Sequence, residues 1–373
     1  MTDINFLKNN LRPFQEILNE YYEYLQPSVN LVILQNRLTE LKNDINKWEQ
    51  REKIRNQVKK LLNRYQPQQL SKEWFDLRSK MLSASSDIGV ITGLSYSQSH
   101  GKTRPFKIDE NKRKKEIEEL ILKKCGYELC KFTGNDSTRF GSKFEEVANK
   151  IYQYKTKNTV LQFGLLQHPK YSFIGASPDG ITTTGIMIEI KCPPKRKITG
   201  IVPENYWCQM QVQMDVADLN ECDFVECSFV ECSKEECMES AQEFKGVIGE
   251  MYKCSCDCSC NCYNNLDNRI YIYPSEIIDT ITNQKKNIKN DYYTKYAHLY
   301  KFKNFNYWIL NVYSQVKVER DTVWWNENIK KITDTWNEIL RYRSDKNLVN
   351  ELVNCHLTQE QTKKQNDFSA CFE

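Results

Sequence analysis

The chain is 373 residues long, with 40% hydrophobic and 27% charged residues, so it can fold around a sizeable core as one large domain or two smaller ones. Its 53 Lys and Arg residues against 49 Asp and Glu residues leave a net charge of +4, so a polyanionic partner must be met by local basic patches. Because no stretch approaches the roughly 20 apolar residues of a transmembrane helix and the start, MTDINFLKNN, lacks a signal core, we expect an intracellular protein that does not act at a membrane.

Residues 1–66 are predicted to form a helical N-terminal extension. Apolar side chains recur there every three or four positions, which is typical of an amphipathic helix with one buried stripe. The stripe consists of Leu31, Ile33, Leu34, Leu38, Leu41, Ile45 and Trp48. Pro67 interrupts the pattern. We interpret the extension as a packing or partner-binding element.

A second unit begins at Ser71 and is predicted to form the core of the protein over residues 71–250. Its start, SKEWFDLRSKMLSASSDIGVITGLS, predicts a helix, a short turn and a second helix with Ser85 or Ser86 as its N-cap. The Lys- and Arg-rich run over residues 102–124 is typical of a solvated helix face, and it is also suited to contacting a phosphate backbone.

The middle of this unit alternates between helical and strand patterns. TRFGSKFEEVANKIYQYKT and PENYWCQMQVQMDVAD predict helices. VLQFGLLQHP, YSFIGASPDG and GIMIEIKCP are three short β-like runs separated by turn residues, and CDFVECSFVECS alternates like a strand. This order predicts an α/β fold with a mixed β-sheet core flanked by helices.

Three segments complete the chain. We expect a cysteine-rich insertion over residues 251–268, a helical C-terminal part that packs on the core over residues 269–345, and a flexible tail over residues 346–373. The aromatic-rich stretch between residues 279 and 343 is interpreted as helical throughout.

The stretch GASPDGITTTGIMIEIKCP carries the side chains most indicative of chemistry. On a strand, Glu189 and Lys191 project from one face about 7 Å apart. Asp179 lies in the turn that ends the preceding strand, and it approaches Glu189 if that strand and the Glu-x-Lys strand pair as a hairpin. Converging carboxylates repel each other unless a cation such as Mg²⁺ lies between them, and a lysine beside the metal stabilises charge on a phosphate. The pattern suits metal-assisted phosphodiester hydrolysis, and a solvated hairpin with a surface Glu-Lys pair is the alternative.

The sequence resembles the lambda exonuclease and YqaJ viral recombinase family of PD-(D/E)XK nucleases from about residue 72 to residue 230. SPDG and EIKCP resemble its catalytic motif, EWFDLRSKMLSAS its opening motif, FGSKFEEVA its glycine-then-glutamate helix and YWCQMQVQMDV its Gln-x-Gln helix. Each motif is weak by itself, whereas five in the family's order are specific. The resemblance implies a restriction-endonuclease-like core.

By this resemblance, Asp179 and Glu189 would be metal ligands, the backbone carbonyl of Ile190 would complete the inner shell, and Lys191 would be the catalytic lysine. Glu145 would lie near the metal from its helix. The implied cofactor is Mg²⁺, with Mn²⁺ as a substitute.

The remaining implied roles concern water and DNA. Glu146 is the alternative to Glu145. Gln209 would orient the attacking water or a phosphate, and Gln211 is its alternative and a DNA contact. Arg78 and Ser85 would bind the terminal 5′-phosphate of DNA, because an arginine fork and a hydroxyl at a helix start suit a phosphate; an ordinary surface arginine and an N-cap serine are the alternative.

The 15 cysteines, in a large chain without a signal segment, are expected to be thiols or metal ligands. One run alternates with single residues and consists of Cys254, Cys256, Cys258, Cys260 and Cys262. A second set recurs every five residues and consists of Cys222, Cys227, Cys232 and Cys237. Because the alternating run lacks the paired spacing of a structural zinc site, we expect a loop without stable metal. Cys192 is expected to pack beside the site.

Together these features predict a Mg²⁺-dependent DNA exonuclease that degrades duplex DNA from free ends in the 5′-to-3′ direction, in viral recombination or repair. The family resemblance implies a ring-like homo-oligomer; we also expect a strand-annealing partner and, for a viral protein, the host cytoplasm. A structure-specific or restriction-like endonuclease is one alternative. A non-catalytic DNA-binding recombination scaffold is the other.

Overall fold

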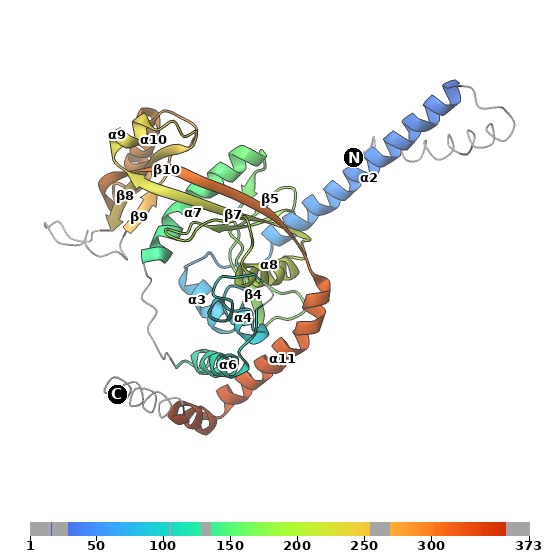
Figure 1. The fold of residues 1–373 in the computed structure, drawn as a ribbon, viewed down its shortest axis with the longest axis vertical. Helices are drawn as coiled ribbons and strands as arrows, with labels where there is room; N and C mark the ends of the chain where they lie inside the picture. Colours follow the sequence, from blue (N-terminus) through green and yellow to red (C-terminus); the bar gives the residue numbers. More distant parts are fainter. Residues whose placement is uncertain (1–15, 17–28, 104–105, 128–135, 254–268, 356–373) are drawn as a thin grey trace. The chain divides into compact units, whose positions relative to one another are not determined.

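A computed structural model describes residue 16 and residues 29–103, 106–127, 136–253 and 269–355 (Figure 1). The start of the predicted N-terminal extension, the alternating cysteines of residues 254–262 and the last part of the predicted tail therefore lie outside the described residues. The chain divides into two compact units, residues 1–63 and 64–373. In the described ranges, no helix combines the length and the apolar character needed to cross a membrane.

The first unit contains one long helix, α2 (Val29–Leu62), which confirms the helical prediction there. The expectation of a continuous buried stripe is wrong for two of its members, since Leu41 is 45% and Trp48 39% exposed.

The second unit is built on a seven-stranded mixed sheet in the order β2-β5-β6-β7-β10-β8-β9. In that order the strands are Val160–Leu161, Gly180–Thr182, Met187–Lys191, Glu221–Cys232, Tyr300–Glu319, Lys245–Lys253 and Arg269–Ile272. β6 and β7 are parallel, and every other neighbouring pair is antiparallel. A smaller sheet in the order β1-β4-β3 comprises Leu82–Ser83, Ile174–Ala176 and Leu166–Gln167.

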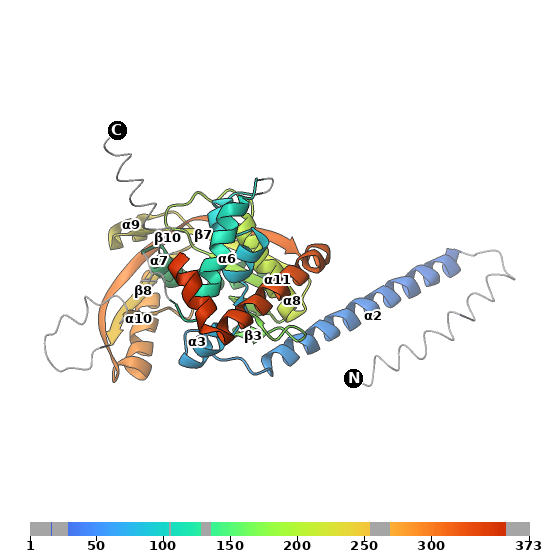
Figure 2. The ribbon, with the colours of Figure 1, turned by 90° about the horizontal axis from the view of Figure 1, so that it is seen from below.

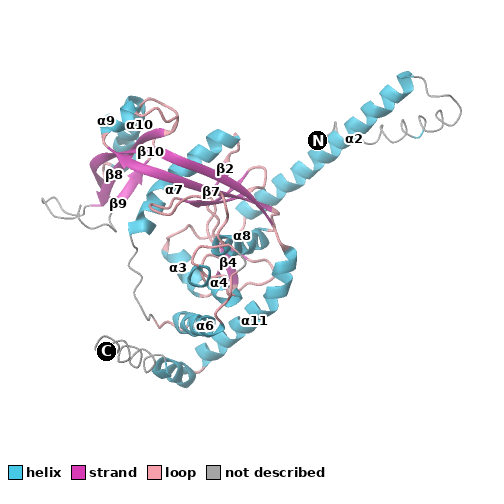
Figure 3. Cartoon of the chain, in the orientation of Figure 1, coloured by secondary structure: helices cyan, strands magenta, loops and turns pink. Residues whose placement is uncertain are grey.

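Helices flank the sheet on both faces, which confirms the predicted mixed α/β class (Figure 3). The helices of this unit are α3 (Lys72–Ser79), α4 (Asp87–Thr92), α5 (Tyr96–Ser99), α6 (Glu110–Lys124), α7 (Asp136–Thr156), α8 (Glu204–Ala217), α9 (Lys234–Glu239), α10 (Ile281–Asp291), the π-helical turn Tyr292–Tyr296 and α11 (Thr322–Ser344). Phe144 and Ile151 of α7 share one core cluster with Ile188 and Ile190 of β6. Because side chains alternate along a strand, Glu189 and Lys191 project to the opposite face, where α8 lies.

The prediction of a wholly helical C-terminal part is wrong for β9 and for the 20-residue strand β10. β10 pairs with β7 on one side and with β8 on the other, so it lies inside the sheet and does not pack on its outside. A bulge between Leu310 and Val312 interrupts its alternation, which hides the two-residue period that marks a strand. The flanking helices α10 and α11 agree with the prediction.

Of the two N-caps predicted for the second helix of the core, Ser85 and Ser86, the structure has Ser86. α4 starts at Asp87 with Ser86 as its N-cap, although the Ser86 side chain makes no capping hydrogen bond. Behind α4, helices α6 and α11 lie side by side, as two perpendicular views show (Figures 1 and 2).

Candidate active site

The hairpin formed by β5 and β6 brings Asp179 to the Glu-x-Lys triplet. Gly180 of β5 pairs with Ile188 of β6, so Asp179, which directly precedes β5, lies beside the next residues of β6. Its Oδ2 accepts a 2.7 Å hydrogen bond from the backbone N–H of Ile190. The predicted pairing of the strand before Asp179 with the Glu-x-Lys strand is wrong, because that strand, β4, belongs to the smaller sheet. The strand that pairs with β6 is β5, which follows Asp179 in the chain.

Glu189 is fully buried, and both of its carboxylate oxygens are hydrogen-bonded. Oε1 accepts a 2.8 Å hydrogen bond from Nε2 of Gln209 and pairs with the ammonium of Lys191. Oε2 accepts a 2.9 Å hydrogen bond from Nε2 of Gln213. Residues four apart on a helix lie on the same face, so α8 presents both amides to the strand and holds the carboxylate in one orientation.

Lys191 is held as a cation beside this carboxylate. Its side chain is 25% exposed, and its Nζ lies 5.1 Å from the centre of the Tyr206 ring. Burial by itself would lower the pKa of Lys191, but Glu189 and Asp179 outweigh burial and raise this pKa above its ordinary value. The ammonium is therefore suited to stabilising negative charge and is unsuited to accepting a proton from water.

Helix α7 adds a third carboxylate, that of Glu145. Burial raises the pKa of Asp179 well above its ordinary value, Glu189 and Glu145 raise it further, and Lys191 opposes the shift. Glu145 is exposed to solvent, but partial desolvation still raises its pKa. Lys191 opposes this shift and Glu189 adds to it. Three carboxyl groups thus lie within electrostatic reach of one ammonium, which pairs with Glu189.

A cleft of about 380 Å³ opens beside these carboxylates, lined in part by Glu145, Glu146, Asp179 and Ile190. Among the residues that the structure describes, no group of three or more His, Cys, Asp or Glu side chains is arranged to hold a metal ion. A site with one or two carboxylates and several waters is nevertheless the usual environment of Mg²⁺. The repelling oxygen donors here fit such a hard cation.

Arg78 and Ser85 lie side by side, since Nη2 of Arg78 donates a 2.9 Å hydrogen bond to Oγ of Ser85. The guanidinium lies 4.8 Å from the centre of the Trp74 ring. Nε1 of Trp74 in turn donates a 3.0 Å hydrogen bond to Oγ of Ser177, two residues before Asp179. This series of contacts connects the Arg78–Ser85 pair to the segment that carries the first carboxylate.

A buried ion pair supports this region from behind. Nζ of Lys124, the last residue of α6, lies 2.7 Å from Oδ2 of Asp87, the first residue of α4. Burial would raise the pKa of Asp87, but Lys124 and Lys123 outweigh it and lower the pKa to about 2. One member of the basic run at residues 102–124 is therefore paired inside the fold and is not available to DNA.

Gln211 is not brought to the cluster. It is buried, its Nε2 donates a 2.9 Å hydrogen bond to the carbonyl of Glu319, and its Oε1 accepts one of 2.6 Å from the N–H of Asp321. A two-residue step rotates a helix by about 200°, which explains the different face. The sequence analysis missed Gln213, and the available signal was its four-residue spacing from Gln209.

The cysteines of the described segments lie mostly in the interior. Cys192 is buried in the same core cluster as Ile190, as predicted. Of the set with five-residue spacing, Cys222, Cys227 and Cys237 are buried and Cys232 is partly buried. Burial raises the pKa of Cys227 to about 12, which disfavours the thiolate that metal binding requires.

The part of the chain that carries the site matches the model of a known domain family. Residues 73–220, which include the hairpin, α7, α8 and Arg78, match the model of the YqaJ-like viral recombinase domain. This part of the chain is therefore similar to the domain of this family, as the motifs of the sequence predict.

Individual relatives add detail. The chain is 32% identical over 174 residues to an uncharacterized protein of Acanthamoeba polyphaga mimivirus, an alignment covering 42% of this chain but only 28% of the relative's length. An alkaline exonuclease from Laribacter hongkongensis is 18% identical, with a TM-score of 0.40 over 79% of this chain and 99% of that one. A phage-related exonuclease from Haemophilus somnus is 14% identical, with a TM-score of 0.35 over 72% of this chain and 96% of that one.

Proposed function

We propose that the chain is a metal-dependent DNA exonuclease. The observation that carries this proposal is the cluster of Asp179, Glu189 and Glu145 around the ammonium of Lys191, within a YqaJ-like viral recombinase domain. A protein that only binds DNA has no need for repelling, partly buried carboxylates, because they weaken its attraction for phosphate. The cluster therefore favours the enzyme over the non-catalytic scaffold.

In this proposal Asp179, Glu189 and the carbonyl of Ile190, with Glu145 beside them, would hold a divalent cation, Mg²⁺ or, as a substitute, Mn²⁺. Each carboxylate oxygen has two lone-pair sites, so the donors already bound to Glu189 leave room for a metal bond. When bound, such a cation lowers the pKa of a coordinated water and polarises the phosphate.

The residues of the chain supply the rest of the chemistry. Lys191 places its ammonium where negative charge develops on the phosphate in the transition state. Gln209 and Gln213 keep the Glu189 carboxylate in position through their amide hydrogen bonds. Gln209, which is almost buried, also has a carbonyl oxygen with which to orient the attacking water.

The 5′-to-3′ direction rests on the Arg78–Ser85 pair. A guanidinium and a hydroxyl already within hydrogen-bond distance of each other can both donate to one terminal phosphate. The contacts through Trp74 and Ser177 connect this pair to Asp179. Holding the terminal phosphate there would set the scissile bond at a fixed distance from the cation.

The wider role follows from the family and is part of the same proposal. The description of the domain as a viral recombinase and the mimivirus relative support a function in viral recombination or repair. The substrate would be double-stranded DNA with free ends, in the host cytoplasm. We extend the proposal to a strand-annealing partner and a ring-like homo-oligomer, which would keep the enzyme on its DNA.

The test is incubation of the full chain with linear and circular duplex DNA, each with and without Mg²⁺. Degradation of the linear form alone, and only with the cation, is the expected result. Lys191→Ala should slow it at least a hundredfold, about 3 kcal/mol, while DNA binding persists. Lys195→Ala is the matched control, because it removes an exposed lysine four residues away. Nicking of circles would favour the endonuclease, and binding without cleavage the scaffold.

A further inference from the structure

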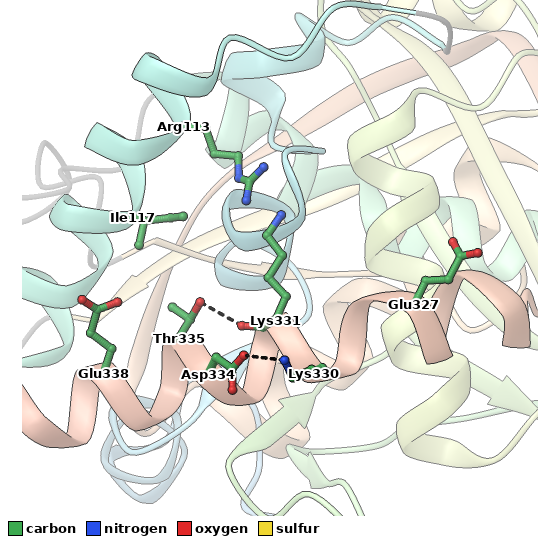
Figure 4. A pocket seen from close by; sticks show the side chains of 8 residues that line it. All are labelled: Arg113, Ile117, Glu327, Lys330, Lys331, Asp334, Thr335 and Glu338. Atoms are coloured by element: carbon green, nitrogen blue, oxygen red, sulfur yellow. Dashed lines mark hydrogen bonds and ion pairs between the residues drawn. The ribbon is translucent and has the colours of Figure 1, made fainter.

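A second cleft, of about 400 Å³, lies between α6 and α11 and takes no part in the proposed active site. Arg113 and Ile117 of α6 line it from one side, and Lys331 and Thr335 of α11 line it from the other. The guanidinium of Arg113 and the ammonium of Lys331 point toward each other across the cleft (Figure 4). Two facing cations repel each other, so this arrangement requires an explanation.

Lys331 is the less stabilised of the two cations. It is partly buried, and within the described ranges its ammonium forms no hydrogen bond or ion pair. Burial, followed by the Arg113 charge, lowers the pKa of Lys331 to about 8, and Glu110 opposes the shift only in part. An ammonium in such a position gains from any anion that enters the cleft.

Arg113 is held in place by its surroundings. Its side chain is only 16% exposed. The aliphatic part packs against Gly93 at the end of α4, so closely that a Cβ added to Gly93 would lie 3.4 Å from Cδ of Arg113. Nη1 bonds both oxygens of Glu110 at 3.0 and 3.1 Å, whereas Nε is buried without a hydrogen-bond partner among the described residues. The guanidinium is therefore oriented but incompletely satisfied.

Glu110 is paired with Arg113, but no acidic residue that lines the cleft pairs with Arg113 or Lys331 among the described residues. Asp334 lies 4.0 Å from Lys330, and Glu338 lies 3.9 Å from Arg341. Figure 4 shows Glu327 and Glu338 directed away from the two facing cations. The space between Arg113 and Lys331 thus remains open to an anion.

We propose that Arg113 and Lys331 bind a phosphoryl group across this cleft. A guanidinium fork and an ammonium are the two donors that proteins use most for phosphate oxygens, and an anion between them converts repulsion into two attractions. The phosphoryl group could belong to a DNA strand or to free phosphate or a mononucleotide. A DNA strand is long enough to reach it, because Arg113 lies about 16 Å along α6 from Lys124, which backs the Arg78 region.

The first experiment measures the anion directly on the wild-type full chain. Lysines are acylated briefly at pH 8 in EDTA, and the modified sites are quantified by mass spectrometry. About half of the Lys331 side chains would be uncharged at this pH, against under about 1% for an ordinary lysine, so Lys331 should react at least tenfold faster than Lys330. Inorganic phosphate, exchanged for chloride at constant ionic strength, should slow Lys331 at least threefold and leave Lys330 unchanged.

The second experiment separates the two sources. Binding of linear duplex DNA to the wild type, Lys331→Ala and Lys330→Ala is measured in EDTA at several salt concentrations. If the ligand is a DNA phosphate, Lys331→Ala should reduce the slope of log K against log salt by about 1, and the control Lys330→Ala should leave it unchanged. An unchanged slope together with phosphate protection would assign the site to free phosphate or a nucleotide. Absence of protection together with equal slopes in all three proteins would overturn the proposal. No cleavage is measured, so this result is independent of the proposed nuclease activity.

Discussion

Gln213 offers a sharp test of the candidate site, because its substitution changes the geometry of Glu189 without removing any group that holds the metal or carries charge. In Gln213→Ala the Oε2 atom of a fully buried carboxylate loses its 2.9 Å hydrogen bond. Gln209 and Lys191 remain on Oε1. The carboxylate is then bonded on one oxygen only and is free to rotate about its last side-chain torsion.

The size of the effect follows from the chemistry of that bond. A hydrogen bond to a charged group contributes about 1.5–3 kcal/mol. If this energy serves to hold the carboxylate for catalysis, its loss lowers kcat by about 10- to 150-fold. If it serves only the fold, the free energy of unfolding falls by a similar amount and the activity of the folded protein is unchanged.

Gln211→Ala is the matched control. Gln211 lies on the same helix, is equally buried, and also loses its hydrogen bonds on substitution, but its partners are Glu319 and Asp321 and not the cluster. We expect both variants to lose stability in urea, and only Gln213→Ala to lose more than tenfold in kcat on linear DNA at saturating Mg²⁺. Equal kcat values for the two variants would refute the assigned role of Gln213.

Three further outcomes are expected. Asp87→Asn should lower the free energy of unfolding by about 2 kcal/mol at pH 7. The pKa of Asp87 in the folded protein, about 2, lies below the ordinary value of 3.8. The difference from wild type should therefore be present above pH 4 and shrink as the pH falls toward 2, as measured by denaturant titration. Wild type should degrade 5′-phosphorylated duplex faster than the 5′-hydroxyl form, and Arg78→Ala should reduce that preference at fixed ionic strength; equal slowing of both substrates would make Arg78 a general backbone contact. Serine at all five alternating cysteines should preserve Mg²⁺-dependent cleavage, and zinc or iron that is lost together with activity would contradict this. Those cysteines are Cys254, Cys256, Cys258, Cys260 and Cys262.

Local sequence determined the parts of the protein whose geometry depends on near neighbours. The alternation of side chains on a strand placed Glu189 and Lys191 on one face. The seven-residue step from Arg78 to Ser85 likewise brought these two side chains together. Helical spacing located α7 and α8.

Tertiary structure decided what depends on partners distant in the chain. Residues 300–319 carry an interrupted alternation that local pattern could not assign, and they became a central strand because β7 and β8 supply hydrogen-bond partners on both edges. Gln211 and Gln213 are the same residue type on the same helix. Only the packing of β6 and β10 around α8 brings Gln213 to Glu189 and Gln211 to the end of β10. Arg113 and Lys331 are separated by more than half the chain, so their repulsion arises only once α6 and α11 pack together. Local spacing fixes the face on which a side chain lies, and only the packing of distant segments fixes what that face meets.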